Sequence, residues 1–424
     1  MLTVKFILDN KELLIERLSI KNFDAEGIFD EVIAADLQRK STQQKLDEIL
    51  SKLNSSSKQI GQLFKSGKIE EANKAKAETA ELKELSKDLN KQLPIVEKKL
   101  HDFLTLIPNI PHESVPRGNS EADNTEIATG GKMPEMCENP LAHWDLAKKY
   151  DIIDFELGNK ITGAGFPVYK GKGAKLQRAL INFFLDEAQN NGYAEIQPPV
   201  LVNEDSGFGT GQLPDKEGQM YHVGADNLYL IPTAEVPITN IYRNVILSAN
   251  DFPIKNTAYS PCFRREAGSY GKDVRGLNRL HQFDKVEIVT IAHPEKSYEI
   301  LKDMVKYVSK LIEKLELPYR LLKLCGGDLS FTSALTFDFE VFAAAQKKWL
   351  EVSSVSNFEN YQANRLKLRF KEEGGKKTKL AHTLNGSALA LPRIVAALLE
   401  NNQTTEGIKI PKVLQKYTGF EIIS

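Results

Sequence analysis

The stretch PCFRREAGSY, residues 261–270, combines the end of an expected strand with a loop of small residues. We predict strand structure from Pro261 to Arg265. Two basic residues and a carboxylate come together where this strand ends. Side chains two positions apart on a strand share one face, so we expect Arg264 and Glu266 to project together toward a single ligand.

A second run, HQFDKVEIVTI at residues 281–291, is the expected partner strand. If the two runs pair as a hairpin, one face gathers four side chains, those of Arg264, Glu266, Phe283 and Glu287. This set suits ATP, because a guanidinium binds phosphate in a fork geometry, a carboxylate accepts the adenine amine, and an aromatic ring stacks on the base with roughly 1–3 kcal/mol. The simpler alternative is a surface salt bridge beside a core phenylalanine. The second run, extended back to residue 279, places three further side chains on that face: Arg279, His281 and Lys285.

The surrounding sequence alternates expected helices and strands. Helical spacing occurs at 173–193, 297–316 and 393–402, and extended segments are expected at 194–203, 227–232 and 349–355. Hairpin-connected strands mixed with helices indicate an α+β domain around an antiparallel sheet, not a doubly wound parallel sheet. The sequence contains neither GxxxxGK[ST] nor GxGxxG, so the usual phosphate-binding loops are absent from it.

Residues 31–103 differ in character and are rich in Lys, Glu, Gln, Leu, Ser and Ala. Apolar residues recur at intervals of seven on either side of KSGK (65–68): Leu46, Leu53 and Ile60 with Leu50 and Phe64 between them, then Leu82, Leu89, Val96 and Phe103 with Leu85 and Leu100. We therefore predict an antiparallel helical hairpin, a two-stranded coiled coil. Pro94 lies inside the second run, but the heptad phase is the same on both sides, so we expect one long second helix.

Three prolines in IPNIPHESVPRG (107–118) predict a linker after the hairpin. We expect an N-terminal helical domain at 1–110 and an α+β domain at 111–424. No stretch of the sequence reaches the about 18 apolar residues of a membrane span, and we expect a cytoplasmic protein without a membrane partner.

Charge and cysteine content narrow the function classes. The 424-residue chain has a net charge of −1, so a polyanion would have to bind a local patch. Three cysteines, Cys137, Cys262 and Cys325, form no CxxC pair. This spacing argues against a disulfide framework and against a cysteine-rich zinc site.

FRREAG followed by RLHQFDKVE resembles the second signature motif of class II aminoacyl-tRNA synthetases. Further segments in the same order resemble the seryl-tRNA synthetase family, of the zinc-free bacterial and eukaryotic type: IPNIPHESVP, GYAEIQPPVLVN, GTGQLP, IPTAEVP, WLEVSSVSNFENYQANR and TLNGSALALPR. The match covers essentially the whole chain. It implies a class II catalytic antiparallel sheet flanked by helices, with a tRNA-binding N-terminal coiled-coil arm, which agrees with the pattern above.

The resemblance implies a nucleotide site. Its expected catalytic residues are Arg264 on the α-phosphate, Glu266 on adenine, and Arg393 over the base and at the γ-phosphate. Phe283 would stack on the other side of the base. Glu351 and Ser354 would hold Mg²⁺ with ATP, because a hard cation prefers oxygen ligands. The full implied ATP-binding set is Arg264, Arg265, Glu266, Arg279, Leu280, Phe283, Glu351, Val352, Ser353, Ser354 and Arg393.

The resemblance also implies an L-serine pocket, made of Thr233, Ala234, Glu235, Arg264, Glu287, Asn385 and Ser387. Glu287 with Thr233 would accept the ammonium, and Glu287 with Ser387 would hydrogen-bond the hydroxyl. A site built to bond a hydroxyl rejects alanine, because its own polar groups would be left unpaired. Without the resemblance, TAE (233–235) would be interpreted as a helix start with Thr233 as N-cap, and Asn385-Gly386 as a turn.

The implied activity is that of a serine–tRNA ligase. The serine carboxylate attacks the α-phosphorus of ATP to give seryl-adenylate, and the serine is then passed to tRNA(Ser); the family often charges tRNA(Sec) as well. Positioning and charge stabilisation drive the first step, so no general base is required. The resemblance further implies a homodimer with PPVLVN (198–203) as a contact, and no zinc.

Two other interpretations remain open. One is a class II synthetase for threonine or proline, although threonine recognition there relies on zinc and the chain lacks a Cys/His cluster. The other is an inactive relative that binds RNA or an amino acid, against which the intact ligand residues argue. The sequence departs from the family at four positions outside the expected ligands: Ala388 and Pro392, where glycine is frequent, and Ser333 and Phe337, where alanine and tyrosine are usual.

The turn of the expected hairpin carries an excess of positive charge. Six lysines between Lys52 and Lys76 stand against two acids, Glu70 and Glu71, which leaves four uncompensated positive charges. Lys-rich heptad flanks are usually solvated helix surfaces, but this excess is concentrated at the turn. Basic side chains bind the RNA backbone, so we expect tRNA contacts from Lys58, Lys65 and Lys68.

Replacement of Lys58, Lys65 and Lys68 by alanine is therefore expected to weaken tRNA charging and to spare adenylate formation. The two steps are separated by measuring aminoacylation beside ATP–pyrophosphate exchange. Equal losses in both assays would refute this division of labour.

Overall fold

In this computed structural model the structure describes residues 1–135, 138–215, 218–266 and 275–424. Cys137 and the last four residues of the stretch 261–270 lie outside these ranges. The chain separates into two compact units. One contains Met1–Ser19 and Phe23–Pro108, and the other contains Ile20–Asn22 and Asn109–Ser424.

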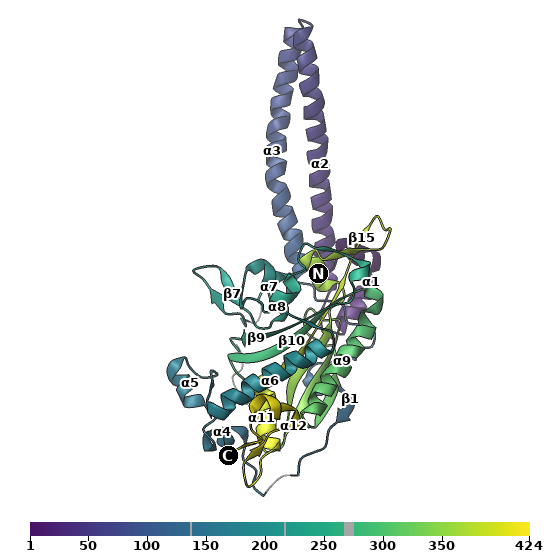
Figure 1. Ribbon diagram of the computed structural model, residues 1–424. Helices are drawn as coiled ribbons and strands as arrows, with labels where there is room; N and C mark the ends of the chain where they lie inside the picture. Colours follow the sequence, from purple (N-terminus) through teal and green to yellow (C-terminus); the bar gives the residue numbers. More distant parts are fainter. Residues whose placement is uncertain (136–137, 216–217, 267–274) are drawn as a thin grey trace. The chain divides into compact units, whose positions relative to one another are not determined.

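The first unit consists of helices α1 (Val4–Ser19), α2 (Glu26–Lys65) and α3 (Ile69–Thr105). Helices α2 and α3 lie side by side and are joined by a tight turn at 66–68 (Figure 1). Gly67 supplies the turn with a φ of 75°, which glycine adopts without a steric penalty. The predicted coiled-coil hairpin is confirmed, and α3 continues through Pro94 as one helix, as predicted.

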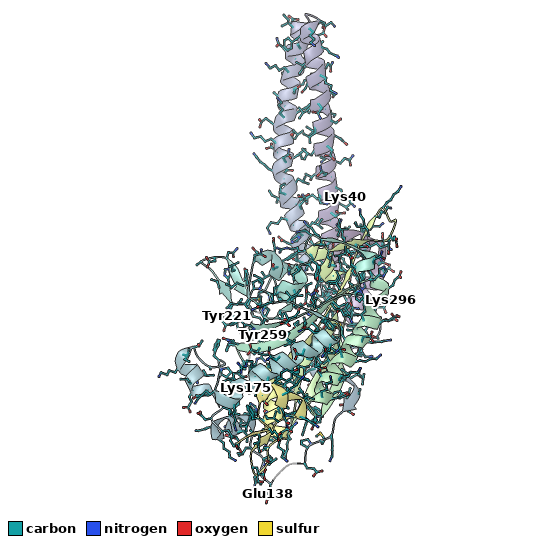
Figure 2. All side chains as sticks on the ribbon, in the orientation of Figure 1. Lys40, Glu138, Lys175, Tyr221, Tyr259 and Lys296 are labelled. Atoms are coloured by element: carbon teal, nitrogen blue, oxygen red, sulfur yellow. The ribbon has the colours of Figure 1, made fainter. Side chains whose placement is uncertain are left out.

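An apolar seam joins the two long helices. Its members are Leu46, Ile49, Leu53, Leu82, Leu89 and Leu93. Three predicted seam residues instead face solvent: Leu50, Phe64 and Leu85 are 40%, 47% and 50% exposed. Most side chains along the hairpin point away from the partner helix (Figure 2).

Small and polar residues occupy further seam positions on α3. Ala72, Thr79 and Ser86 are buried at intervals of seven on α3. Together with the row Leu82 and Leu89 they alternate in steps of three and four, which is the spacing of a coiled-coil seam. A hydrophobic spacing count passes over them because it tracks only large apolar side chains.

The second unit is built on an eight-stranded sheet with the strand order β1-β11-β12-β13-β16-β10-β9-β4. Its strands are β1 (Thr125–Gly130), β4 (Ala194–Glu195), β9 (Ile254–Phe263), β10 (Gln282–Ala292), β11 (Tyr319–Lys323), β12 (Leu335–Ala343), β13 (Lys348–Asn357) and β16 (His382–Ala390). Strand β4 runs parallel to β9, and the other neighbouring pairs are antiparallel. The predicted α+β class with an antiparallel sheet is confirmed.

Smaller sheets and short helices complete the unit. The small sheets are β5 (Leu201–Val202), β7 (Leu228–Leu230) and β6 (His222–Val223); β8 (Ile246–Ser248), β14 (Arg369–Lys371) and β15 (Thr378–Leu380); β2 (Ile153–Asp154) with β3 (Val168–Tyr169); and β17 (Ile408–Lys409) with β18 (Ile422–Ile423). The short helices are α4 (His143–Lys149), α5 (Phe155–Ile161), α7 (Glu204–Thr210), α8 (Glu235–Asn240), α10 (Tyr361–Leu366) and α12 (Lys412–Thr418).

Three longer helices cover one face of the large sheet: α6 (Gly171–Asn190), α9 (Ser297–Lys314) and α11 (Leu391–Asn401) (Figure 1). The main core joins their apolar faces to Val286 and Ile288 of β10. Because side chains alternate across a strand, Lys285 and Glu287 of β10 point to the opposite face. The helices thus fix the sheet from one side and leave the other side to carry polar groups.

The strand expected at Pro261–Arg265 ends earlier, at Phe263. The Arg264 N–H still donates to the carbonyl of His281, at 2.9 Å, but the Arg265 N–H donates to the Gln219 carbonyl. The backbone therefore leaves the ladder at Arg265. A second correction concerns Asn385-Gly386, which lies inside β16 between β10 and β13 and is not a turn.

Two further observations concern the described part of the chain. Both described cysteines, Cys262 and Cys325, are buried free thiols. Within the described ranges, no helix has the length and apolar character needed to span a membrane.

The seam predicts that Leu89→Ala will loosen the hairpin whereas Leu85→Ala will not. Leu89 is buried against the facing helix, and its truncation is expected to cost roughly 2 kcal/mol or more through the cavity that it leaves. Leu85 lies four residues earlier and is half exposed. Amide hydrogen exchange of α2 and α3 measures the difference, and equal acceleration in both variants would contradict the assigned seam.

Candidate functional site

Glu287 lies at the centre of the polar face of the sheet. It is 2% exposed and sits on β10 directly opposite Ser387 of β16. One carboxylate oxygen, Oε2, accepts a hydrogen bond from Thr233 Oγ1 at 3.1 Å. The structure therefore brings Thr233, Glu287 and Ser387 together, although 54 residues separate the first two and 100 separate the last two.

Lys285 is a residue of this site that the sequence interpretation did not assign. Its Nζ lies 2.6 Å from Glu287 Oε2, and the two side chains are 8% and 2% exposed. A buried carboxylate requires a partner of opposite charge or several donors, and Lys285 supplies the charge. The signal was present, because Lys285 is two residues before Glu287 on the same strand face.

Glu235 forms the second acidic position of the pocket. Ala234 is the N-cap residue of α8, and the Glu235 N–H donates to Thr233 Oγ1 at 3.2 Å. Burial, and then the nearby Glu287, raise the pKa of the Glu235 carboxyl to about 7. Residues 233–235 therefore begin a helix, as the local pattern suggests, but the N-cap is Ala234 and not Thr233. Thr233 instead bonds Glu287.

Gln362 holds Glu235 in place, and the sequence interpretation did not assign it. Gln362 Nε2 donates to Glu235 Oε1 at 2.7 Å and to the Thr210 carbonyl at 3.1 Å. The Thr383 hydroxyl donates to Gln362 Oε1 at 2.7 Å. Gln362 lies within the quoted segment 349–365, but spacing alone does not distinguish it from its neighbours.

Asn385 and Ser387 come from the middle of the sheet. Asn385 pairs with Val289 on one side and Ser356 on the other, and it is buried. The Ser387 carbonyl accepts a hydrogen bond from Ser353 Oγ at 2.6 Å. All six expected pocket residues other than Arg264 are buried: Thr233, Ala234, Glu235, Glu287, Asn385 and Ser387.

Arg264 and Phe283 lie at the outer end of the same face. Phe283 pairs with Cys262 across the β9–β10 ladder, and Arg264 extends the row of Cys262. The centre of the Arg264 guanidinium is 5.2 Å from the centroid of the Phe283 ring, within the range of a cation–π contact. The expected hairpin thus places a guanidinium and an aromatic ring in contact, in line with Lys285 and Glu287.

Glu266 turns back toward Arg279 after the strand ends. Its φ is 50°, in the left-handed region that is uncommon for residues other than glycine. The Glu266 carboxylate forms an ion pair with Arg279. Leu280, the next residue after Arg279, is buried. Glu266 and Arg279 are therefore held together by their ion pair just beyond the end of β9.

Arg393, near the start of α11, is held by two backbone carbonyls. Its Nε donates to the Asn278 carbonyl at 3.1 Å, and its Nη1 donates to the Glu351 carbonyl at 2.7 Å. The Glu351 carboxylate lies 3.8 Å from the same nitrogen. Arg393 of α11 is thereby tied to β13 and to the segment that leads into β10.

Side chains with oxygen atoms gather on β12 and β13. Ser354 pairs with Asp338 across this ladder. Asp338 Oδ1 is buried and has no hydrogen-bond partner among the described residues. Burial, and then the nearby Glu351, raise the pKa of the Asp338 carboxyl. The sequence interpretation named Glu351 and Ser354 but missed Asp338, whose position follows only from the strand register.

The remaining expected residues are placed differently. The Val352 side chain belongs to the main core, so only its backbone is available to a ligand. Arg265 is held at its backbone by Gln219. In the first unit Lys58, Lys65 and Lys68 are exposed, and Lys68 lies 3.1 Å from the Glu71 carboxylate. Over the described ranges, no group of three or more His, Cys, Asp or Glu side chains is arranged to hold a metal ion.

Two family models match the chain. The seryl-tRNA synthetase N-terminal domain matches residues 1–111, and the tRNA synthetase class II core domain (G, H, P, S and T) matches residues 221–402. The first match spans the hairpin, and the second contains the strands that carry the site.

Full-length relatives agree with these models. Serine–tRNA ligase from Salinibacter ruber is 50% identical over 96% of this chain and 95% of the relative. The enzyme of the same name from Thermodesulfovibrio yellowstonii is 44% identical over the full length of both.

Solved structures give the same picture. Seryl-tRNA synthetase from Pyrococcus horikoshii complexed with ATP is similar with a TM-score of 0.91 and 34% identity, over 100% of this chain and 99% of that chain. Prolyl-tRNA synthetase from Giardia lamblia has a TM-score of 0.55 at 15% identity, over 64% of this chain and 54% of that chain, and shares the fold alone.

The raised pKa of Glu235 predicts a pH-dependent loss of stability. A carboxyl with a pKa of about 7 in the folded protein and 4.5 in the unfolded chain binds more protons when folded. Its contribution to stability is therefore lost as the pH rises from about 4.5 to about 7. Glu235→Gln is expected to remove that loss, whereas the exposed control Glu81→Gln retains it.

Urea unfolding at several pH values measures this effect. Both tryptophans, Trp144 and Trp349, lie in the second unit, so their fluorescence reports on the unit that contains Glu235. Identical pH profiles for wild type and Glu235→Gln would show that Glu235 does not titrate in this range.

Proposed function

The chain belongs to the seryl-tRNA synthetase family, and we infer that it activates L-serine with ATP to seryl-adenylate and transfers the serine to tRNA(Ser). It is an ATP-dependent serine–tRNA ligase. The observation that carries the assignment of the pocket is the buried group of Thr233, Lys285 and Glu287, with Ser387 opposite. We propose roles for these residues below.

The pocket suits a small amino acid with a hydroxyl group. The Glu287 and Glu235 carboxylates supply acceptors for the ammonium in a place without bulk water. Ser387 and Glu287 face each other across two paired strands, so one can donate to and the other accept from the hydroxyl. Alanine would leave both groups unpaired, which costs more than the loss of a contact. Threonine would have to be excluded by the shape of the pocket, because it also carries a hydroxyl group.

Arg264 binds the serine carboxylate and the α-phosphate at the junction of the two sites. Its position beside Phe283 supports this role, because the adenine then stacks next to the phosphate-binding guanidinium. Glu266, oriented by Arg279, accepts the adenine amine. Arg393 covers the other side of the base and reaches the γ-phosphate. These contacts orient the serine carboxylate for attack at the α-phosphorus and stabilise the charge that develops there.

Magnesium would bind with ATP at β12 and β13. Glu351 and Ser354 offer oxygen ligands, and the buried Asp338 Oδ1 lacks a partner among the described residues, which fits a hard cation. When bound, the ion neutralises phosphate charge. Asp338, Glu351 and Ser354 would hold the ion, and Arg393 would steady this strand through its hydrogen bond to the Glu351 carbonyl.

The exposed lysines of the hairpin, Lys58, Lys65 and Lys68, support contacts with the tRNA backbone. We further propose a homodimer in which residues 198–203 contribute, since Leu201 in this segment is 39% exposed. A cytoplasmic location and tRNA(Sec) as a second acceptor are parts of the same proposal.

ATP–pyrophosphate exchange tests the assignment. We expect exchange with serine and none above background with threonine, alanine or glycine. Glu287→Gln is expected to lower kcat/KM for serine by roughly 100-fold, because a buried hydrogen bond to a charged group is worth about 1.5–3 kcal/mol.

The exchange assay also separates the alternatives. Exchange with threonine or proline in place of serine would identify a different specificity. No exchange with any of these amino acids, at a preserved unfolding temperature, would identify an inactive relative. Glu81→Gln on the first unit serves as the matched substitution that should leave exchange unchanged.

A further inference from the structure

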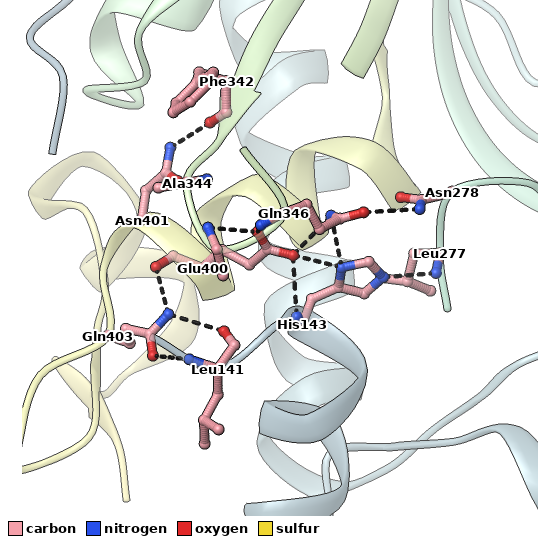
Figure 3. A network of polar contacts seen from close by, with 11 residues as sticks. Leu141, His143, Leu277, Asn278, Phe342, Ala344, Gln346, Glu400, Asn401 and Gln403 are labelled. Carbon is pink, nitrogen blue, oxygen red and sulfur yellow. Dashed lines mark hydrogen bonds and ion pairs between the residues drawn. The ribbon is translucent and has the colours of Figure 1, made fainter. Parts of the chain in front are cut away.

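A buried hydrogen-bonded pair of a histidine and a glutamate, outside the ligand residues, links two helices of the second unit. His143, the first residue of α4, and Glu400, near the end of α11, are both fully buried. The Glu400 carboxylate accepts five hydrogen bonds (Figure 3). The donors are the His143 N–H and Nδ1, the Ala345 N–H, and the Gln346 N–H and Nε2, at 2.7–3.1 Å. The carboxylate is thus fully satisfied as an anion.

The hydrogen bonds of His143 fix its tautomer. Its Nε2 accepts a hydrogen bond from the Leu277 N–H at 2.8 Å, so this nitrogen carries no proton. The proton is therefore on Nδ1, which donates to Glu400 at 2.8 Å. A carboxylate behind the ring orients it toward Leu277 and makes Nε2 a stronger acceptor.

The backbone segment bonded by His143 leads directly to Arg279, one of the proposed ATP-binding residues. Residues 275–278 precede Arg279, the partner of Glu266. Gly276 adopts a φ of 65° and packs so closely that an added Cβ would lie 2.2 Å from His143 Nε2. The Arg275 guanidinium lies 4.5 Å from the centroid of a Trp144 ring. Two successive residues at the start of α4, His143 and Trp144, therefore contact this segment.

A second branch of the network reaches Arg393. Gln346, whose Nε2 donates to Glu400, accepts a hydrogen bond from Asn278 Nδ2 at 2.9 Å through its Oε1 (Figure 3). The Asn278 carbonyl in turn accepts from Arg393 Nε at 3.1 Å. Glu400 thus connects to Arg279 through His143 and Leu277, and to Arg393 through Gln346 and Asn278.

We propose that the His143–Glu400 pair positions residues 275–279 and Arg393 for binding ATP. The proposal rests on the assigned ATP-dependent function. Neither residue contacts the serine pocket in the described structure. The pair therefore governs the ATP side of the reaction and leaves the amino acid side unchanged.

Two substitutions at His143 separate its two hydrogen bonds. His143→Gln can place an amide oxygen near the position of Nε2 and so keep an acceptor for Leu277. His143→Asn can place an amide near Nδ1 and so keep a donor for Glu400, but it leaves the Leu277 N–H without a partner. We expect His143→Asn to raise KM for ATP in serine-dependent exchange by about tenfold, with KM for serine within twofold of wild type, and His143→Gln to stay closer to wild type.

Asn401→Ala is the matched control for fold stability. Asn401 follows Glu400 on α11, and its amide bonds the Phe342 carbonyl and the Ala344 N–H. It does not bond residues 275–279 in the described structure. We expect Asn401→Ala to lower the unfolding temperature while KM for ATP stays within twofold of wild type. Gln346→Ala, at a less buried position, is expected to raise KM for ATP several-fold and provides a second test if His143→Asn does not fold.

Several outcomes would overturn the proposal. The first is an unchanged KM for ATP in His143→Asn or in Gln346→Ala. The second is an equal increase in KM for ATP in His143→Asn and His143→Gln. The third is an increase in KM for ATP in Asn401→Ala as large as that in His143→Asn. A wild-type protein without serine-dependent exchange would instead refute the assigned function, so the two failures are distinguishable.

Discussion

The contact between Lys285 and Glu287 is the interaction on which the site depends. A carboxylate at 2% exposure is strongly destabilising unless an opposite charge or several donors compensate it. Lys285 supplies that charge from two residues away on the same strand, so the pair is rigid without any loop contribution. Glu235 forms no ion pair among the described residues, and burial, followed by the nearby Glu287, raises the pKa of its carboxyl to about 7. Within the described residues the site thus holds one acid paired with a lysine and one without an ion pair, a combination that would suit the single positive charge of an amino acid ammonium.

Strand pairing explains why these groups meet. The polar face of β10 is built opposite a core that α6, α9 and α11 fill from the other side. Glu287 and Ser387 then become neighbours through register, and Arg264 follows the row of Cys262 to the edge. Strand register likewise places Asp338 of β12 beside Ser354 of β13.

Much of this arrangement was predictable from the sequence, and the exceptions have physical causes. Period-two alternation located Phe283 and Glu287 on one face, and heptads located the hairpin and its turn. Lys285 shares that face, but alternation alone does not show that its side chain is buried against Glu287. Asp338 and Gln362 depend on strand register and tertiary packing, which a single sequence does not encode in any local pattern. Leu50, Phe64 and Leu85 were wrongly predicted in the seam because a heptad count of large apolar residues ignores small and polar ones. Thr79 and Ser86 are buried in the seam instead.

Those small and polar seam residues have a mechanical consequence for the hairpin. Large apolar side chains hold the two helices together between Leu46 and Leu53 on α2 and between Leu82 and Leu93 on α3. Beyond that stretch, Ala72 and Thr79 bury far less apolar surface, so opening there costs less free energy. The hairpin is therefore stiffer between Leu82 and Leu93 than near its turn. The helical turns next to residues 66–68 can adjust locally to a curved, irregular polyanion without bending the whole hairpin.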